Sequence, residues 1–391
     1  MPPSTMIRGA RLFDGAALRQ GRHASVLVAR GRITDVDLDG SAPPDGARVV
    51  DLGDVTLLPG LVDAHLHLGF DPEGNAVEQM QRDSDAVLLR RMHDNAQVAL
   101  HAGITTVRDL GDRRYLGVTL RERYAADPGA GPEVLVAGPP ITPTRGHCWF
   151  LGGEADGLDA LLHAVEERAT RGVDVVKIMA TGGMLTPGRA LHESQYTRRE
   201  LAAVTDAAHR AGLPLTAHAH GPAGIADAVA AGADGVEHCT FVGATGIEPD
   251  WSTVAALADA GTFVGATEAW LPDGPPIPAG ELIERGWENL ARMHREGVRV
   301  VCCSDAGIGP RKPHDVLPHG VALLASLGFR TADALAAVTS VAADACGLTG
   351  RKGRLLPGHD ADVLAVAGDP TRTPDALLDV RAVFRAGRRV V

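Results

Sequence analysis

Histidine is the residue whose placement in this chain most directly suggests chemistry. Six of the sixteen histidines end or follow runs of mostly apolar residues: His65, His67, His147, His218, His220 and His238. Neutral imidazole is the commonest nitrogen ligand of divalent metal ions in proteins. Side chains two positions apart on a strand point to the same face, so the pairs at 65/67 and 218/220 can each hold one ion. Together these six residues predict a metal site.

Lys177 stands inside the apolar run Val-Val-Lys-Ile-Met, and only three of the 38 basic residues are lysine. Burial would strip the hydration of its ammonium group and favour the neutral amine. A neutral amine can react with CO₂ to give a carbamate, an anionic oxygen ligand that can bridge two cations, and arginine has no equivalent reaction. The alternative is a buried stem whose ammonium group reaches solvent. We favour the functional interpretation.

Asp305 ends a further apolar run, Val-Val-Cys-Cys-Ser-Asp, and is followed by Ala-Gly. An aspartate in such a place is often a turn former or a helix cap. Since it follows a predicted strand in the same way as the histidines, we interpret it as a metal ligand or a proton shuttle.

The elements that must position these residues are strands that alternate with helices. Helix-like stretches rich in Ala, Leu, Glu and Arg lie at 158–171, 198–211, 223–231, 252–260 and 331–346. The strand-like runs are 57–68, 104–109, 133–141, 173–180, 213–220, 235–239, 262–268 and 298–305. Eight such units predict an α/β fold with a (β/α)₈ TIM barrel, whose active site lies at the carboxyl ends of the strands. An open doubly wound sheet is the alternative, but no GxGxxG follows the first strand.

Both ends of the chain are rich in short strands instead, at 24–29, 31–36, 361–366 and 380–386. We therefore expect the termini to pair into one small β-sandwich domain around the inserted barrel. The expected divisions are 1–57 and 351–391 for the small domain and 58–350 for the barrel.

Composition excludes several classes of partner. Hydrophobic residues make up 45% and charged residues 22%, as in a globular protein. With 4% aromatic residues and a net charge of −11, no surface for nucleic acid is expected. No apolar run is long enough for a membrane span. The five cysteines follow no disulfide pattern, which favours a cytoplasmic location. A small molecule is therefore the expected substrate. The composition leaves open whether the protein forms a homo-oligomer.

Residues spread along the whole chain resemble the amidohydrolase superfamily. They are Pro59-Gly-Leu-Val-Asp-Ala-His-Leu-His67, Lys177, His218, His238 and Asp305, followed by Lys352-Gly-Arg-Leu-Leu-Pro-Gly-His-Asp-Ala-Asp-Val-Leu364. Gly138-Pro-Pro-Ile-Thr142, Gly146-His147 and Lys177-Ile-Met-Ala-Thr-Gly-Gly183 are similar to the Xaa-Pro or Xaa-Arg dipeptidase and carboxypeptidase branch. Imidazolonepropionase is a relative whose typical members hold one metal and no carbamylated lysine, so Lys177 indicates the two-metal branch.

The resemblance implies a site with two divalent ions, most simply Zn²⁺. His65, His67 and Asp305 would hold the more buried ion, and His218 and His238 the more exposed one. A carbamate formed from CO₂ on Lys177, together with a hydroxide, would bridge them. Asp305 would then carry a proton from the attacking hydroxide to the leaving nitrogen.

The resemblance also implies substrate contacts. His147 and His220 would face the substrate, or support a metal ligand from behind. Tyr196, Arg145 and Arg189 would anchor a terminal carboxylate, the alternative being that they are surface residues in loops. The implied function is hydrolysis of an amide or peptide bond in a dipeptide or N-acyl amino acid. A cyclic amidase or lactonase, such as an imidazolonepropionase-like enzyme, and a non-catalytic metal-binding protein are the alternatives.

Overall fold

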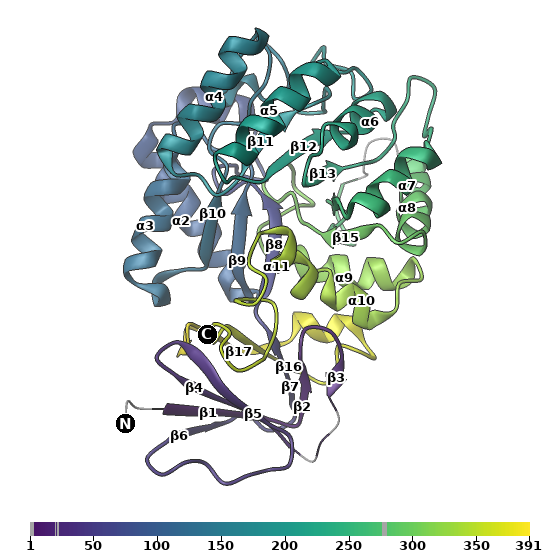
Figure 1. Ribbon diagram of the computed structural model, residues 1–391. Coiled ribbons are helices and arrows are strands. Elements are labelled where there is room, and N and C mark those ends of the chain that lie inside the picture. Colours follow the sequence, from purple (N-terminus) through teal and green to yellow (C-terminus); the bar gives the residue numbers. More distant parts are fainter. Residues whose placement is uncertain (1–3, 20, 22, 276–279) are drawn as a thin grey trace.

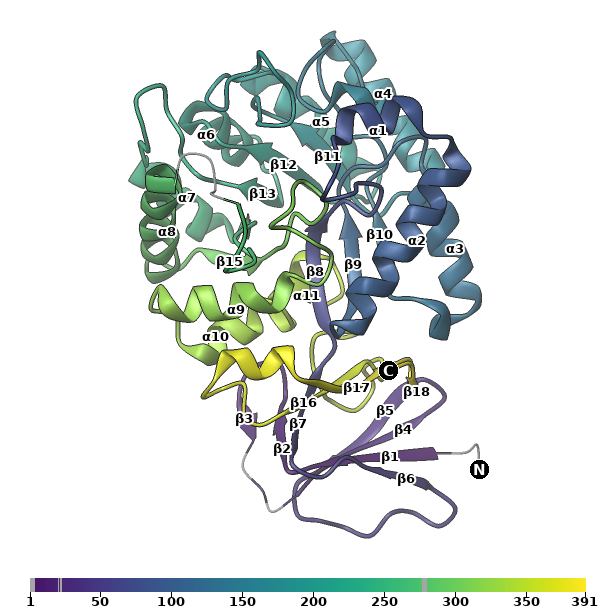
Figure 2. The same ribbon diagram turned by 180° about the vertical axis from the view of Figure 1, so that it is seen from behind.

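The computed structural model describes residues 4–19, 21, 23–275 and 280–391. Figure 1 shows a larger part, in which strands alternate with helices, next to a smaller part built mostly of strands. Both chain ends lie with the smaller part, so the chain enters the larger part once and returns (Figure 2).

Two sheets make up the smaller part. One is four-stranded, with the order β5-β4-β1-β6, and the other is six-stranded, with the order β18-β17-β16-β7-β2-β3. The strands are β1 (Ser4–Gly9), β2 (Arg11–Phe13), β3 (Leu18–Arg19), β4 (Ala24–Ala29), β5 (Arg32–Asp37), β6 (Arg48–Asp51), β7 (Val55–Pro59), β16 (Val363–Ala367), β17 (Val380–Arg385) and β18 (Arg388–Arg389).

The six-stranded sheet joins the two ends of the chain, as the sequence predicts. β16 pairs antiparallel with β7, with Val363 opposite Pro59. One buried apolar cluster draws on both sheets, since it contains Val26 and Val28 of the four-stranded sheet and Phe384 of the six-stranded one. The sandwich arrangement and the domain limits at 57/58 and 350/351 stay predictions.

Eight parallel strands carry the larger part, in the chain order that the sequence predicts. They form a three-stranded sheet, β10-β9-β8, and a five-stranded sheet, β11-β12-β13-β14-β15. Single bridges join the two sheets at both junctions, Ile141 with Ile178 and Leu66 with Ala306. Closure into one continuous barrel stays a prediction. The strands are β8 (Leu61–Leu66), β9 (Ile104–Asp109), β10 (Glu133–Val136), β11 (Val176–Met179), β12 (Leu215–Ala219), β13 (Gly235–His238), β14 (Phe263–Ala266) and β15 (Arg299–Cys302).

Helices surround these strands in both views (Figures 1 and 2). They are α1 (Ala76–Arg82), α2 (Asp85–His101), α3 (Leu116–Ala126), α4 (Gly157–Arg171), α5 (Arg198–Arg210), α6 (Pro222–Ala230), α7 (Trp251–Ala260), α8 (Gly280–Arg295), α9 (Leu317–Ser326), α10 (Thr331–Ala336) and α11 (Ser340–Ala345). Within the described ranges, no helix has the length and apolar character needed to cross a bilayer.

Helix α5 illustrates how sequence sets these elements. Thr197 and Glu200 form a capping box at its start, which satisfies free backbone N–H groups there. Leu201, Val204 and Ala208 are buried, at the spacing of one helix face. The apolar stripe packs into the main core, and the capping box fixes where the helix begins.

Two predicted elements are each divided in the structure. The run 57–68 is not one strand, because the chain leaves β7 at Gly60 and starts β8 in another sheet. Gly60 is tightly packed there: an added Cβ would lie 2.1 Å from Oγ1 of Thr105. The stretch 331–346 forms α10 and α11, since the carbonyl groups between them bond to strands. Ala337 accepts from Cys302 of β15, and Val338 accepts from Val62 of β8.

Candidate metal centre

The strand ends bring the predicted histidines, lysine and aspartate together. His65 lies in β8, Lys177 in β11 and His218 in β12, while His238 ends β13. The ring centroids of His65 and His238 are 5.1 Å apart, and those of His218 and His238 are 4.6 Å apart. His67 follows β8, with its ring 5.4 Å from that of His65. Residues far apart in the chain therefore form one cluster.

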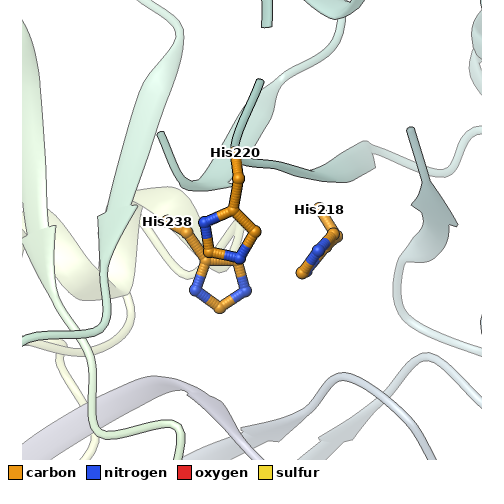
Figure 3. Close-up of side chains that lie close together, drawn as sticks. All are labelled: His218, His220 and His238. Atoms are coloured by element: carbon orange, nitrogen blue, oxygen red, sulfur yellow. The ribbon is translucent and has the colours of Figure 1, made fainter. Parts of the chain in front are cut away.

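The candidate ligand atoms fall into two overlapping groups in the described part of the chain. The nitrogens of His218, His220 and His238 lie within 4.8 Å of one another, and Figure 3 shows the stacked rings of His220 and His238 with His218 beside them. The second group is His65, His238 and Asp305. The predicted division put His238 with His218 on the more exposed ion, with Lys177 as a bridge. The structure brings His220 close to these two histidines and places His238 in both groups.

Asp305 faces His65 of β8 and His67, which follows that strand. Its Oδ1 lies 3.2 Å from Nε2 of His67 and 3.5 Å from Nε2 of His65. Asp305 and His238 both have left-handed backbone, with φ of 53° and 67°. This conformation costs a non-glycine residue about 1–2 kcal/mol, so the surrounding packing must enforce it. Such strain at two strand ends is typical of a functional site.

Burial favours the neutral form of four histidines in the cluster. Burial lowers the pKa of His65 to about 4 and that of His220 to about 4. Burial and the neighbouring imidazoles also lower the pKa of His218 and of His238 well below the usual value. Since metal binding requires the unprotonated nitrogen, these rings are available as ligands at neutral pH.

Lys177 is the strongest indication that a group belongs in the cluster. Its side chain is 1% exposed, and among the described residues its Nζ has no hydrogen-bond partner. Burial lowers the pKa of this amine to about 8. Buried polar atoms in native proteins almost always have a partner. An unpartnered amine beside unprotonated imidazoles and a carboxylate fits a divalent metal centre with an anionic group on the lysine.

Glu237 is a site residue that the sequence reasoning missed. Its Oε2 lies 2.9 Å from Nδ1 of His65, while its Oε1 accepts from Thr216 at 2.6 Å and from Arg108 at 3.2 Å. Burial alone would raise its pKa, but the facing His65 and Lys177 hold it below the usual range. The carboxylate therefore fixes a proton on Nδ1 of His65 and leaves Nε2 free for a ligand bond. An acidic residue within the apolar strand before His238 was the available signal.

His147 and His220 lie where the sequence predicts, in the cluster. The His147 ring is 4.5 Å from that of His218, and burial lowers its pKa to about 3. Gly183 makes room for it, since an added Cβ would be 2.4 Å from Nε2 of His147. His220 places Nδ1 2.9 Å from the hydroxyl of Thr240.

The three predicted carboxylate anchors lie in other surroundings. Tyr196 is 5% exposed in the main core, and its hydroxyl donates to the carbonyl of Ala155 at 2.9 Å. The phenol hydroxyl of Tyr196 is therefore hydrogen-bonded within the fold. Arg145 is exposed, and Arg189 donates to its carbonyl at 2.9 Å. The structure brings these arginines to each other, and within the described part of the chain neither makes a hydrogen bond or ion pair with a histidine of the cluster.

The α/β fold places a cluster of candidate metal ligands at the carboxyl ends of parallel strands, an arrangement that suits metal-assisted hydrolysis. Residues 56–390 match the amidohydrolase family, and the chain belongs to that family.

Known proteins resemble this chain over most of its length. Ochratoxinase of Aspergillus niger is 25% identical over 370 residues, covering 84% of this chain and 73% of that enzyme. Imidazolonepropionase of Paracoccus denitrificans is 25% identical over 366 residues, covering 87% and 86%. The crystal structure of a Xaa-Pro dipeptidase with methionine bound in its active site has a TM-score of 0.86 at 25% identity and covers 99% of both chains. The superfamily and the branch predicted from the sequence are confirmed.

Proposed function

We propose that this protein is a two-metal hydrolase that cleaves an amide or peptide bond in a small substrate, a dipeptide or an N-acyl amino acid. The observation that carries the proposal is the buried, unpartnered amine of Lys177 beside the histidine cluster. As a carbamate it would supply the anionic oxygens that two cations need. The eight strands would act as one closed barrel that holds these groups in place.

The proposed ligands divide between two ions, most simply Zn²⁺. His65, His67 and Asp305 would hold one, and His218 and His238 the other, with Lys177 between them. Bound divalent ions activate water at neutral pH and polarise the substrate carbonyl. The cluster as folded supports this assignment because burial lowers the pKa of His65, His218 and His238, which favours their unprotonated forms.

Asp305 would move the proton. Burial alone would raise its pKa, but His65 and the hydrogen bond from His67 lower it below the usual range. Its carboxylate is therefore ionised and able to accept a proton from the attacking water. It would deliver that proton to the amide nitrogen, which leaves as a neutral amine. His147 and His220 line the same cluster and would orient the substrate carbonyl.

Two of the similar proteins support amide chemistry in particular. The names of the ochratoxinase and the Xaa-Pro dipeptidase indicate enzymes that act on small substrates. The dipeptidase structure holds an amino acid, methionine, in its active site. We propose the same class of substrate here, in a cytoplasmic enzyme, with Arg145 and Arg189 as the remaining candidates to meet its carboxylate. A homo-oligomer stays open.

Hydrolysis of dipeptide and N-acyl amino acid panels, with Zn²⁺ and bicarbonate supplied, tests the proposal. Lactones and cyclic amides belong in the same panel, because they represent the alternative substrate class. We expect the variant Asp305→Asn to keep metal but to lose turnover by about 10²–10⁴-fold. Asp344→Asn, at an aspartate paired with Arg299 outside the cluster, is the matched control. Normal turnover in Asp305→Asn would remove the shuttle role, and a chain that binds no metal would remove the proposal.

A further inference from the structure

Lys312 is a second buried lysine beside the cluster. It lies between β15 and α9 in the chain and is 2% exposed. Its Nζ donates to the carbonyl groups of Thr267 at 2.7 Å, Ser304 at 2.7 Å and Ala269 at 3.3 Å. An ammonium group has three N–H donors, so each donor has a backbone acceptor. The ammonium group is therefore hydrogen-bonded entirely to backbone carbonyl groups.

The three carbonyl groups follow the ends of two neighbouring strands, β14 and β15. Ser304 directly precedes Asp305, and Thr267 follows β14. The hydroxyl of Thr267 lies 2.9 Å from Nδ1 of His238. The ammonium group therefore joins the segment that presents Asp305 to the residue that orients His238. These are the two candidate ligands with left-handed backbone.

A lysine suits this position better than an arginine. Three carbonyl oxygens converge on one nitrogen, which matches a compact ammonium group and not a planar guanidinium. The ring of Trp270, with its centroid 3.9 Å from Nζ, covers the ammonium group. The backbone of Lys312 also closes the loop, because its carbonyl accepts from Gly307 at 2.8 Å.

We infer that Lys312 is a positioning residue of the metal centre. Its ammonium group holds the ends of β14 and β15 together and thereby sets the separation of His238 and Asp305. Loss of the three hydrogen bonds frees both strand ends, so the candidate ligands no longer meet a cation with fixed geometry. The inference rests on the proposed function, since it concerns the same site.

Zn²⁺ binding to the metal-stripped protein, measured by competition with a chelator, tests this role without a substrate. We expect Lys312→Met to weaken the binding of at least one ion by about 10–100-fold, as for other residues that support metal ligands. Lys352→Met is the matched control. Lys352 is 4% exposed and fully engaged with Glu133, Asp360 and Asp362, away from the cluster. We expect its affinity for Zn²⁺ to match that of the wild type.

Circular dichroism identifies a temperature at which each variant is folded, and binding is compared there. If Lys312→Met does not fold, Lys312→Arg keeps the cation with a different shape, and we expect weaker Zn²⁺ binding and a changed visible spectrum with Co²⁺. Wild-type affinity in the folded variants, or an equal loss in Lys352→Met, overturns the positioning role while the proposed function stands. A wild-type chain that binds no ion overturns both.

Discussion

Lys177 gives the sharpest prediction, because function and stability should oppose each other there. The charged amine is buried without a hydrogen-bond partner among the residues that the structure describes, and its pKa is about 8 instead of 10.5. This difference corresponds to about 3 kcal/mol of free energy that the folded chain loses at pH 7 by keeping the charge buried. The value already includes attraction to Glu237 and Asp305, which act in the opposite direction. We expect Lys177→Met to stabilise the metal-free protein by about that amount while abolishing metal binding and activity.

The pH dependence has a definite sign. Between pH 8 and 10.5, the unfolded chain holds a proton at residue 177 that the folded chain has lost. Wild-type stability therefore rises with pH in this window relative to the variant. Below pH 8 the full difference is present, and near pH 10.5 it disappears.

Urea unfolding of both metal-stripped proteins in CO₂-free buffer measures the difference. Lys312→Met is the control, because its three donors are bonded in the fold and its removal should destabilise. A Lys177→Met protein that is less stable than the wild type at pH 7, or a difference that does not shrink by pH 10.5, would refute the reasoning.

The remaining predictions concern other parts of the site and fold. Glu237→Gln leaves His65 without its anionic partner, and Zn²⁺ affinity measured against a chelator should fall about 10–100-fold; an unchanged affinity counts against the assignment. Gly183→Ala places a methyl group against His147, so kcat/KM should fall while the melting temperature changes little; unaltered kinetics would show that the ring moves freely. Glu133 has its pKa lowered to about 2, because contacts with Arg351, Lys352 and Arg385 outweigh burial. Its contribution of about 3 kcal/mol is present above pH 4.5 and is lost as pH falls toward 2, so urea unfolding at pH 7, 4 and 3 should show a weaker acid dependence in Glu133→Gln.

Strand positions could be predicted because local patterns decide them. The run 104–109 agrees with β9 as observed, and 24–29 agrees with β4. Parallel strands buried on both faces read as short apolar runs, and the histidines at their ends mark the edge where an active site forms. The cluster itself follows from this rule, since parallel strands bring the carboxyl ends that carry His65, His218 and His238 to the same edge.

Features that depend on contacts across the chain could not be read in the same way. Nothing in the run 57–68 signals that β7 and β8 belong to different sheets, because both halves are apolar. Strand pairing assigns them to different sheets, because β7 pairs with β16 and β8 pairs with β9. Tyr196 could not be placed from the sequence either. Its position before α5 suggests an exposed loop, but its ring packs in the main core and its hydroxyl donates to the carbonyl of Ala155.

Lysine usage links sequence and site more closely than any single motif. The chain has three lysines among 38 basic residues, and all three are at most 4% exposed: Lys177, Lys312 and Lys352. In the sequence, only Lys177 lies in an apolar run, whereas Lys312 and Lys352 lie in polar segments that contain arginine. Each is buried, in a place where the compact ammonium group or neutral amine of lysine differs in shape and chemistry from a planar guanidinium. Two are fully paired, with carbonyl groups or carboxylates, and the third has no hydrogen-bond partner within the described ranges. Since an unpaired buried amine costs stability that the other two positions recover through hydrogen bonds, its retention is best explained by the group that it would carry.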